Sequence, residues 1–370
     1  MAQAFFGGVH PNDMKAATNE KAIEQLQAPA QVVIPMSMHF GAPCTPTVSK
    51  GDYVKLGQKI GEFKGLGAPI HASVSGTVAA VEPRPYSMGG KVMSVVIDND
   101  FKDDLSEEVH APADPDALSV EEMVEMVKQA GIVGMGGATF PTHTKISSGI
   151  GKVDTVIING AECEPYITGD HRAMLERPAE IIGGCCYLAK MFGVSKVVIG
   201  VEDNKKNGIE SLNKVIEEQK APVVVESLRC RYPQGGEKQL CQAITGKQVP
   251  PGGLPANIGC AVFNINTTIA IYHAIKDGMP VVRKVVTVSG SGYGYHSSER
   301  DYDIRGVGDQ FADFLVHSRA EPLGYQYAGS HGKPYAQRAE KVGEASCRAH
   351  RRKLVRAEVL PDDDGIHDVV

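Results

Sequence analysis

The sequence contains no tryptophan, and aromatic residues make up only 6% of its 370 residues. It also lacks an excess of positive charge, because 38 Lys and Arg stand against 44 Asp and Glu, which gives a formal net charge of −6. Nucleic-acid binding relies on basic side chains that neutralise phosphates and on aromatic rings that stack with bases. The two shortages together argue against a nucleic-acid-binding protein.

None of the eight cysteines belongs to a CxxC pair. Structural zinc sites and ferredoxin-type iron–sulfur clusters usually take thiolate ligands from such closely spaced pairs. The sequence therefore predicts no metal site built from a local ligand motif. Scattered cysteines are also typical of a protein whose thiols stay reduced, which favours the cytoplasm.

Long apolar runs are missing as well. No segment approaches the ~18 apolar residues of a membrane-spanning helix, and residues 1–10 lack the basic region and apolar stretch of a secretory signal. We therefore predict a protein without a membrane span of its own.

Glycine, by contrast, is abundant, with 41 residues, or about 11% of the chain against an average of about 7%. Many backbone positions must therefore adopt conformations or close approaches that favour glycine. The length suits about two domains of roughly 150 residues each, so a sizeable core can be buried.

The order of predicted elements indicates two kinds of domain. Short β-type segments separated by turn residues fill residues 32–81 and predict a small all-β module. After residue 119, strands alternate with helices, which indicates parallel βαβ units and an α/β fold. Ser119 and Glu122 form a capping-box pattern that opens the first helix, and Gly131 ends it. Further strands are expected at 153–161, 196–202 and 221–228, helices at 178–192, 205–219 and 264–275, and a last β element at 280–290.

The first candidate site is a glycine-rich loop at residues 131–145. Gly134, Gly136 and Gly137 allow backbone N–H groups to approach an anion closely, and Lys145 adds a positive charge nearby. The spacing fits neither a P-loop nor a usual dinucleotide fingerprint, because this loop precedes a clear strand instead of following one. A flexible surface turn is the alternative interpretation.

The second candidate site directly follows the strand at 153–161. It contributes the amide of Asn159 and the carboxylates of Glu162 and Glu164. Such groups at the end of a strand can bind ribityl or ribose hydroxyls and the edge of a heterocycle. A solvated acidic loop is the alternative.

The third candidate site is a turn that leads into a predicted helix. Tyr232, Gly235, Gly236 and Glu237 can place main-chain donors and a carboxylate against a ligand. The same residues could equally form only a helix N-terminus with Glu237 in its first turn.

Taken in this order, the three motifs resemble a known family. GIVGMGGATFPTH and INGAECEPYITGDHR, together with GGVHP at 7–11, VIPMSMHFGAPC at 33–44 and GKQVPPGGLP at 246–255, are similar to the RnfC family of the Rnf electron-transport complex. The resemblance covers roughly residues 6–290. That family is in turn similar to the flavin-bearing, NADH-oxidising subunit of respiratory complex I.

The resemblance implies a fold and a division into domains. A barrel-sandwich (lipoyl-like) β domain at 1–99 and a linker at 100–118 precede a Rossmann-like α/β domain for FMN and NADH at 119–280. Residues 281–370 would begin a β-grasp segment of the SLBB type and continue into a divergent tail. No lysine occupies residues 73–75, where a lipoyl carrier would need one, so a structural or docking use of the β domain is favoured.

The resemblance also implies an activity. NADH would pass a hydride to FMN, and electrons would leave through 4Fe–4S clusters toward a ferredoxin-type carrier in an ion-translocating complex. The expected partners are NADH and the other membrane and peripheral Rnf subunits, with no nucleic acid, and the expected location is the inner face of the cell membrane. This chain contains no ligand motif for such clusters.

Individual residues match the family's flavin and nucleotide sites. The flavin-phosphate contacts are matched by Gly134, Gly136, Gly137, Lys145, Asn264 and Thr267. The other flavin and nicotinamide contacts are matched by Asn159, Glu162, Tyr232, Gly235 and Glu237. Glu237 is the one residue to which we assign a catalytic role, the orientation of the nicotinamide, because hydride transfer to a flavin needs no acid or base from the protein.

Some positions depart from the complex I pattern. Met135 replaces an arginine, Ala161 replaces an acidic residue, and Gly236 replaces the first of two adjacent glutamates. The flavin would therefore have fewer charged partners here.

The C-terminal part departs from the family altogether. From about residue 291 the hydrophobic periodicity becomes poor and the expected cluster cysteines are missing. We hypothesise that this tail comes from a shifted reading frame or a truncated gene, and we interpret its basic run as solvated charge. Two other functions agree with the same residues: a non-catalytic docking or assembly subunit, and a soluble NADH-dependent electron-delivery flavoprotein.

Overall fold

The structure is a computed structural model that describes residues 5–87 and 89–288. Its first part contains two antiparallel sheets. The four-stranded sheet has the order β1 (Gln31–Pro35), β7 (Lys91–Asn99), β6 (Gly76–Pro85) and β3 (Tyr53–Val54). The three-stranded sheet has the order β2 (Thr45–Pro46), β4 (Lys59–Glu62) and β5 (Ile70–His71). Apolar side chains from both sheets form one core, which includes Ile34, Ile60 and Ile97. The expected all-β module is confirmed.

The second part alternates helices and strands. In chain order its elements are α1 (Val120–Gln129), α2 (Thr142–Gly149), β8 (Thr155–Gly160), α3 (Gly169–Glu176), α4 (Pro178–Phe192), β9 (Val197–Glu202), α5 (Lys206–Gln219), β10 (Val223–Leu228), α6 (Glu237–Thr245), a 3-10 helix (Pro255–Ile258), β11 (Cys260–Asn264) and α7 (Ile265–Asp277). Helix α1 begins with the capping box that the sequence predicts between Ser119 and Glu122. The expected α/β class is confirmed.

All four strands of this second sheet run parallel, in the order β10-β9-β8-β11. The chain moves outward from β8 to β9 and β10, then returns to place β11 on the other side of β8. The direction of winding therefore changes between β8 and β11. In open α/β sheets such a point opens a crevice at the carboxyl ends of the strands, where ligands bind.

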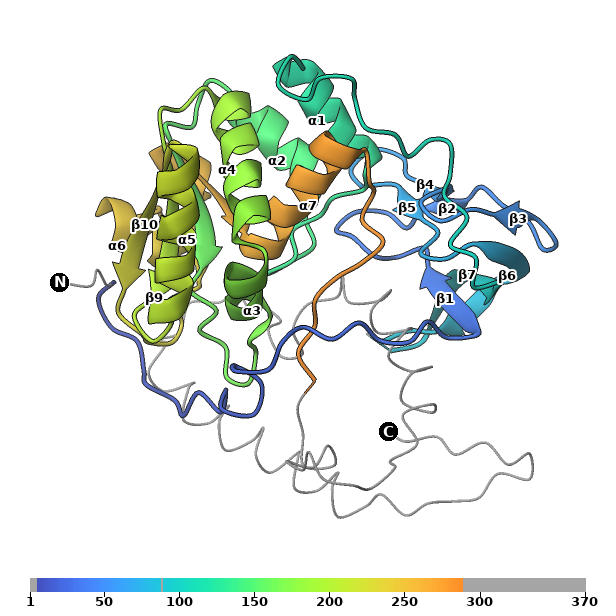
Figure 1. The fold of residues 1–370 in the computed structure, drawn as a ribbon, viewed down its shortest axis with the longest axis horizontal. Coiled ribbons are helices and arrows are strands. Elements are labelled where there is room, and N and C mark those ends of the chain that lie inside the picture. The colour runs from blue at the N-terminus through green and yellow to red at the C-terminus, as the bar shows by residue number, and fades with distance from the viewer. Residues whose placement is uncertain (1–4, 88, 289–370) are drawn as a thin grey trace, which may run out of the picture. The chain divides into compact units, whose positions relative to one another are not determined.

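Both faces of this sheet are covered. Val156 and Ile158 pack into a core that includes α4, α5 and α7, whereas Ile157, between them in the sequence, packs against α6 on the opposite face. This alternation follows from the two-residue period of a strand. Figure 1 shows α4 and α5 side by side over the first of these faces.

One predicted element is absent from the described residues. Residues 281–288, the described part of the β element expected at 280–290, contain no strand. Instead of strand pairing, they make isolated hydrogen bonds to the α/β part. The N–H of Val281 donates to the carbonyl of Ala130, and Oγ1 of Thr287 accepts from the N–H of Thr168. The tail from residue 291, on which the reading-frame hypothesis rests, lies outside the described residues. Among the helices that are described, none has the length and apolar character needed to cross a membrane.

Helix α4 packs against α7 through a glycine, and this contact carries a prediction about stability. A Cβ at Gly184 would lie 2.3 Å from the carbonyl oxygen of Thr268. A Gly184→Ala variant should therefore unfold more easily, because overpacking costs about 1–3 kcal/mol and exceeds the gain of up to ~1 kcal/mol from alanine's helix propensity. Urea unfolding midpoints would measure the change.

Gly208 in α5 is the matched control. The atom nearest its added Cβ is the flexible Sδ of Met174, at 3.3 Å. Gly208→Ala should therefore cost less than Gly184→Ala. A Gly184→Ala protein at least as stable as the unmodified one would contradict this account of the packing.

Candidate functional site

The three candidate loops meet at the carboxyl ends of β8 and β11. Asn159 is the last residue but one of β8, Asn264 is the last residue of β11, and the two are register partners in these neighbouring strands. The second candidate loop leaves the sheet after Gly160, and α7 starts directly after Asn264. The predicted residues are therefore assembled where the winding of the sheet changes direction.

The glycine-rich loop is attached to the N-terminus of α7. The N–H of Gly134 donates to the carbonyl of Phe140 at 3.0 Å, and the N–H of Met135 donates to Oγ1 of Thr267, also at 3.0 Å. A Cβ at Gly136 would lie 3.0 Å from the side-chain amide of Asn264. Glycine at position 136 therefore allows this close approach, because a Cβ there would press against the Asn264 side chain.

The same loop has donors suited to a phosphate group. In the described part of the chain, the N–H groups of Gly136 and Gly137 have no hydrogen-bond partner. A Cβ at Gly137 would meet nothing within 4 Å, so space lies open beside this backbone. Unpaired backbone N–H groups beside open space can bind an anionic phosphate. The residues present therefore fit the phosphate of FMN.

Lys145 and Glu237 form the charged part of the site. Nζ of Lys145, on α2, lies 2.9 Å from Oε1 of Glu237 at the start of α6, and it also donates to the carbonyl of Val262 at 3.0 Å. Both side chains are partly exposed, at 35% and 41%. The structure thus pairs the lysine expected at the phosphate with the carboxylate expected at the nicotinamide. The two side chains lie next to each other in the site.

The second and third loops also contact each other. The amide of Asn159 donates to the carbonyl of Gly235 at 2.8 Å, and the N–H of Gly235 donates to Sγ of Cys163 at 3.2 Å. The Tyr232 hydroxyl donates to Glu164, which opposes the rise in the pKa of Glu164 that burial causes. Burial also raises the pKa of Cys163 to about 11, so this thiol stays protonated at neutral pH.

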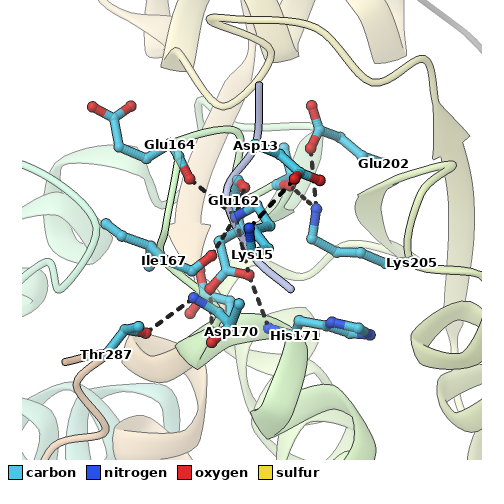
Figure 2. A network of polar contacts seen from close by, with 12 residues as sticks. Asp13, Lys15, Glu162, Glu164, Ile167, Asp170, His171, Glu202, Lys205 and Thr287 are labelled. Carbon is cyan, nitrogen blue, oxygen red and sulfur yellow. Dashed lines mark hydrogen bonds and ion pairs between the residues drawn. The ribbon is translucent and has the colours of Figure 1, made fainter. Parts of the chain in front are cut away.

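Glu162 faces the protein interior. Its carboxylate accepts the N–H groups of Asp170 at 2.6 Å and His171 at 3.3 Å, at the start of α3 (Figure 2). Asp170 in turn accepts from the side-chain amides of Asn264 at 2.7 Å and Asn266 at 2.6 Å. Glu162 and Asn264 thus belong to one polar network, and Asn264 joins this network to the glycine-rich loop because it lies directly beside Gly136.

Gly236 completes the third loop. It is the N-cap of α6, and a Cβ there would lie 2.5 Å from Oε1 of Gln239 and 3.1 Å from the carbonyl of Pro233. A side chain at this position would displace the end of Gln239 and press against the carbonyl of Pro233.

Sequence reasoning missed several polar residues of this region. Lys15 and Lys205 are buried among the loops, and Gln234 is fully buried although neither polar atom of its side chain has a partner within the described residues. Lys15 lies about 150 positions before the loop that it contacts, so no local pattern could reveal it. Among the described residues, no group of His, Cys, Asp or Glu side chains is placed to hold a metal ion.

The buried carboxylate of Glu162 predicts a pH dependence of stability. Burial, aided by the nearby charge of Asp170, raises its pKa from 4.5 to about 8. Its contribution to stability is therefore complete below pH 4.5 and is lost as the pH rises through about 8. Glu162→Gln mimics the protonated form, so its unfolding free energy should fall less between pH 5 and 8 than that of the unmodified protein, by about 1 kcal/mol or more. Urea unfolding across this range, with the exposed Glu217→Gln as control, would test this, and parallel curves for all three proteins would contradict it.

Two family models match the chain in separate parts. The model described as the RnfC barrel sandwich hybrid domain matches residues 3–102, and the one described as the Nuo51 FMN-binding domain matches residues 127–273. The first match covers the two antiparallel sheets. The second covers the α/β sheet with the glycine-rich loop and the buried carboxylates of its site.

Curated relatives agree with these matches. The C subunit of the Na⁺-translocating ferredoxin:NAD⁺ oxidoreductase complex of Acetobacterium woodii is 46% identical over 288 residues, which are 77% of this chain and 65% of that protein. The C subunit of the proton-translocating ferredoxin:NAD⁺ oxidoreductase complex of Clostridium ljungdahlii is 45% identical over 292 residues, 78% of this chain and 64% of that protein. The C subunit of the ion-translocating oxidoreductase complex of Cronobacter sakazakii is 40% identical, over 78% of this chain and 37% of that protein. The chain thus spans less than two thirds of the length of these relatives. Over the residues that it shares with them, the chain belongs to the RnfC family of Rnf complex proteins.

Proposed function

We propose that this chain is an NADH-oxidising, FMN-binding subunit of an ion-translocating electron-transport complex of the Rnf type. The observation that carries the proposal is the assembly of the three loops at the change of winding between β8 and β11. There the N–H groups of Gly136 and Gly137 have no partner among residues 5–87 and 89–288. The match to an FMN-binding family model over the same residues supports it. The relatives are named as subunits of complexes that act on ferredoxin and NAD⁺.

In this proposal each part of the site has its own role. The amides of Gly136 and Gly137 hold the flavin phosphate, with Thr267 fixing the loop through the N–H of Met135. Glu237 orients the nicotinamide of NADH, and Lys145 holds Glu237 in place and adds a positive charge for the flavin phosphate. Bound FMN supplies the hydride-accepting chemistry, whereas the protein supplies position and electrostatics.

The whole complex and the division of the chain belong to the same proposal. The partners would be NADH, the other membrane and peripheral Rnf subunits and a ferredoxin-type carrier, with the chain on the inner face of the cell membrane. The 4Fe–4S clusters expected in the family have no ligand motif in this sequence. The domains would be a barrel-sandwich domain at 1–99, a linker at 100–118, a Rossmann-like flavin domain at 119–280, and a segment from 281 that begins a β-grasp domain of the SLBB type.

A reconstitution experiment tests the proposal. The purified protein would be incubated with FMN, freed of excess flavin, and titrated with NADH without oxygen while the visible flavin absorbance is followed. We expect stoichiometric FMN and bleaching by NADH. A protein that takes up no FMN would contradict the proposal and favour the docking or assembly function. Co-purification with membrane proteins of the complex would distinguish a complex component from a soluble electron-delivery flavoprotein.

A further inference from the structure

The segment before β1 runs along the second and third candidate loops. Val9 forms a β-bridge with Tyr232, and the N–H of Tyr166 donates to the carbonyl of Asp13 at 2.8 Å. Hydroxyl groups of Thr18 and Thr168 also bond each other, at 2.8 Å. Residues 9–18 therefore contact both loops whose carboxylates and amides make up the site.

Lys15 makes the most concentrated contact of this segment. Its side chain is 6% exposed, and its Nζ donates to the carbonyls of Glu162 at 2.9 Å, Glu164 at 3.0 Å and Ile167 (Figure 2). A lysine ammonium has three donors, so its hydrogen-bonding capacity is fully used by one loop. Burying an ammonium is costly unless such partners compensate it. Lys15 thus acts on this loop as a bound cation with carbonyl ligands would.

The loop needs such an anchor because its backbone is strained. Glu162 and Tyr166 adopt φ values of 47° and 71°, which non-glycine residues rarely adopt. Such conformations persist only where surrounding contacts enforce them. Lys15 binds the carbonyls of Glu162 itself, of Glu164 between the two strained residues, and of Ile167 directly after Tyr166. One ammonium therefore holds the backbone at both strained positions.

The held loop is coupled to the glycine-rich loop. The Glu162 carboxylate accepts the N–H of Asp170, and Asp170 accepts from the amide of Asn264, against which Gly136 packs. Nζ of Lys15 lies 3.9 Å from Oε2 of Glu162, at the start of this series of contacts. A shift of the loop at 161–168 would therefore also move the backbone of the glycine-rich loop beside Gly137.

We propose that Lys15 is a positioning residue of the flavin site. It fixes the loop at 161–168 and, through Glu162 and Asp170, the Asn264 side chain against which the glycine-rich loop packs. The part that concerns flavin rests on the proposed function. The part that concerns the loop does not, because it follows from contacts within the protein alone.

Two measurements on the full chain test this. In the first, hydrogen exchange without any ligand would be followed in Lys15→Met, and amides in 161–171 should exchange at least about tenfold faster, while those of β9 and β10 keep their protection. In the second, FMN binding would be titrated by fluorescence quenching, and Lys15→Met should bind at least about tenfold more weakly, equivalent to ~1.4 kcal/mol.

Two lysines serve as controls. Lys21→Met changes an exposed lysine of the same segment and should leave both measurements unchanged. Lys205→Met removes a second buried lysine, which donates to Ala161 at the first residue of this loop but to none of the carbonyls bound by Lys15. It therefore controls for the loss of a buried lysine beside the same loop. Each variant would be measured the same number of degrees below its own melting temperature. Under these conditions Lys15→Met should lose more FMN affinity than Lys205→Met.

The outcomes separate the two claims. Unchanged exchange of 161–171 in Lys15→Met would overturn the positioning role, whether or not flavin binds. Equal losses of FMN affinity in the two buried-lysine variants would also overturn it, because the effect would then be only structural. An unmodified protein that binds no FMN would refute the proposed function, and the exchange measurement would still decide the role of Lys15.

Discussion

A Gly137→Val variant should fold as well as the unmodified protein and bind FMN at least about 100-fold more weakly, a loss of ~2.7 kcal/mol. Its added side chain enters open space, because a Cβ at this position meets nothing within 4 Å. We assign that space to the flavin phosphate, which must approach the N–H groups of Gly136 and Gly137. Melting temperature and FMN titration by fluorescence quenching would measure the two effects.

Graded variants at the neighbouring positions sharpen this prediction. Gly137→Ala should weaken FMN binding less than Gly137→Val, in step with side-chain volume. Gly136→Ala should lower both stability and FMN affinity, because its Cβ would lie 3.0 Å from Asn264. If Gly137→Val binds FMN as tightly as the unmodified protein, the phosphate does not occupy this space.

A Glu237→Gln variant should keep FMN but be reduced by NADH at least about tenfold more slowly, equivalent to ~1.4 kcal/mol of transition-state stabilisation. A glutamine oxygen can still accept from Nζ of Lys145, which lies 2.9 Å from Oε1 of Glu237. Only the negative charge is lost, so the variant isolates the role of that charge toward the nicotinamide. Anaerobic stopped-flow measurement of flavin bleaching would give the rate.

Two further variants complete this test. Glu217→Gln changes an exposed glutamate on α5 and should be reduced at the unmodified rate. Lys145→Met should weaken FMN binding and also slow reduction, because Glu237 then loses its partner. Unmodified reduction rates in Glu237→Gln would remove Glu237 from the nicotinamide site.

Local patterns predicted much of the fold. The capping box at Ser119 and Glu122 forms as its spacing requires, and α4 begins and ends where the apolar periodicity indicates. Both are decided by neighbours within a few residues along the chain. The β element expected at 280–290 has no strand in its described part, since a strand needs a pairing partner that local sequence does not specify.

The site was predictable in its residue types but not in its bonding. The three loops were expected near one ligand, and Asn159 does contact Gly235. The Glu162 side chain points into the protein because it binds the N–H of Asp170 at the start of α3. The loop that carries it is held by Lys15, which lies about 150 residues earlier in the chain. Such contacts arise from the tertiary fold, so sequence spacing carries no signal for them.

The most direct test of the central claim is a crystal structure of the full chain with FMN bound. We expect the flavin phosphate within hydrogen-bond distance of the N–H groups of Gly136 and Gly137, at the carboxyl ends of β8 and β11. Flavin bound elsewhere on the protein, or no flavin at saturating concentration, would contradict it.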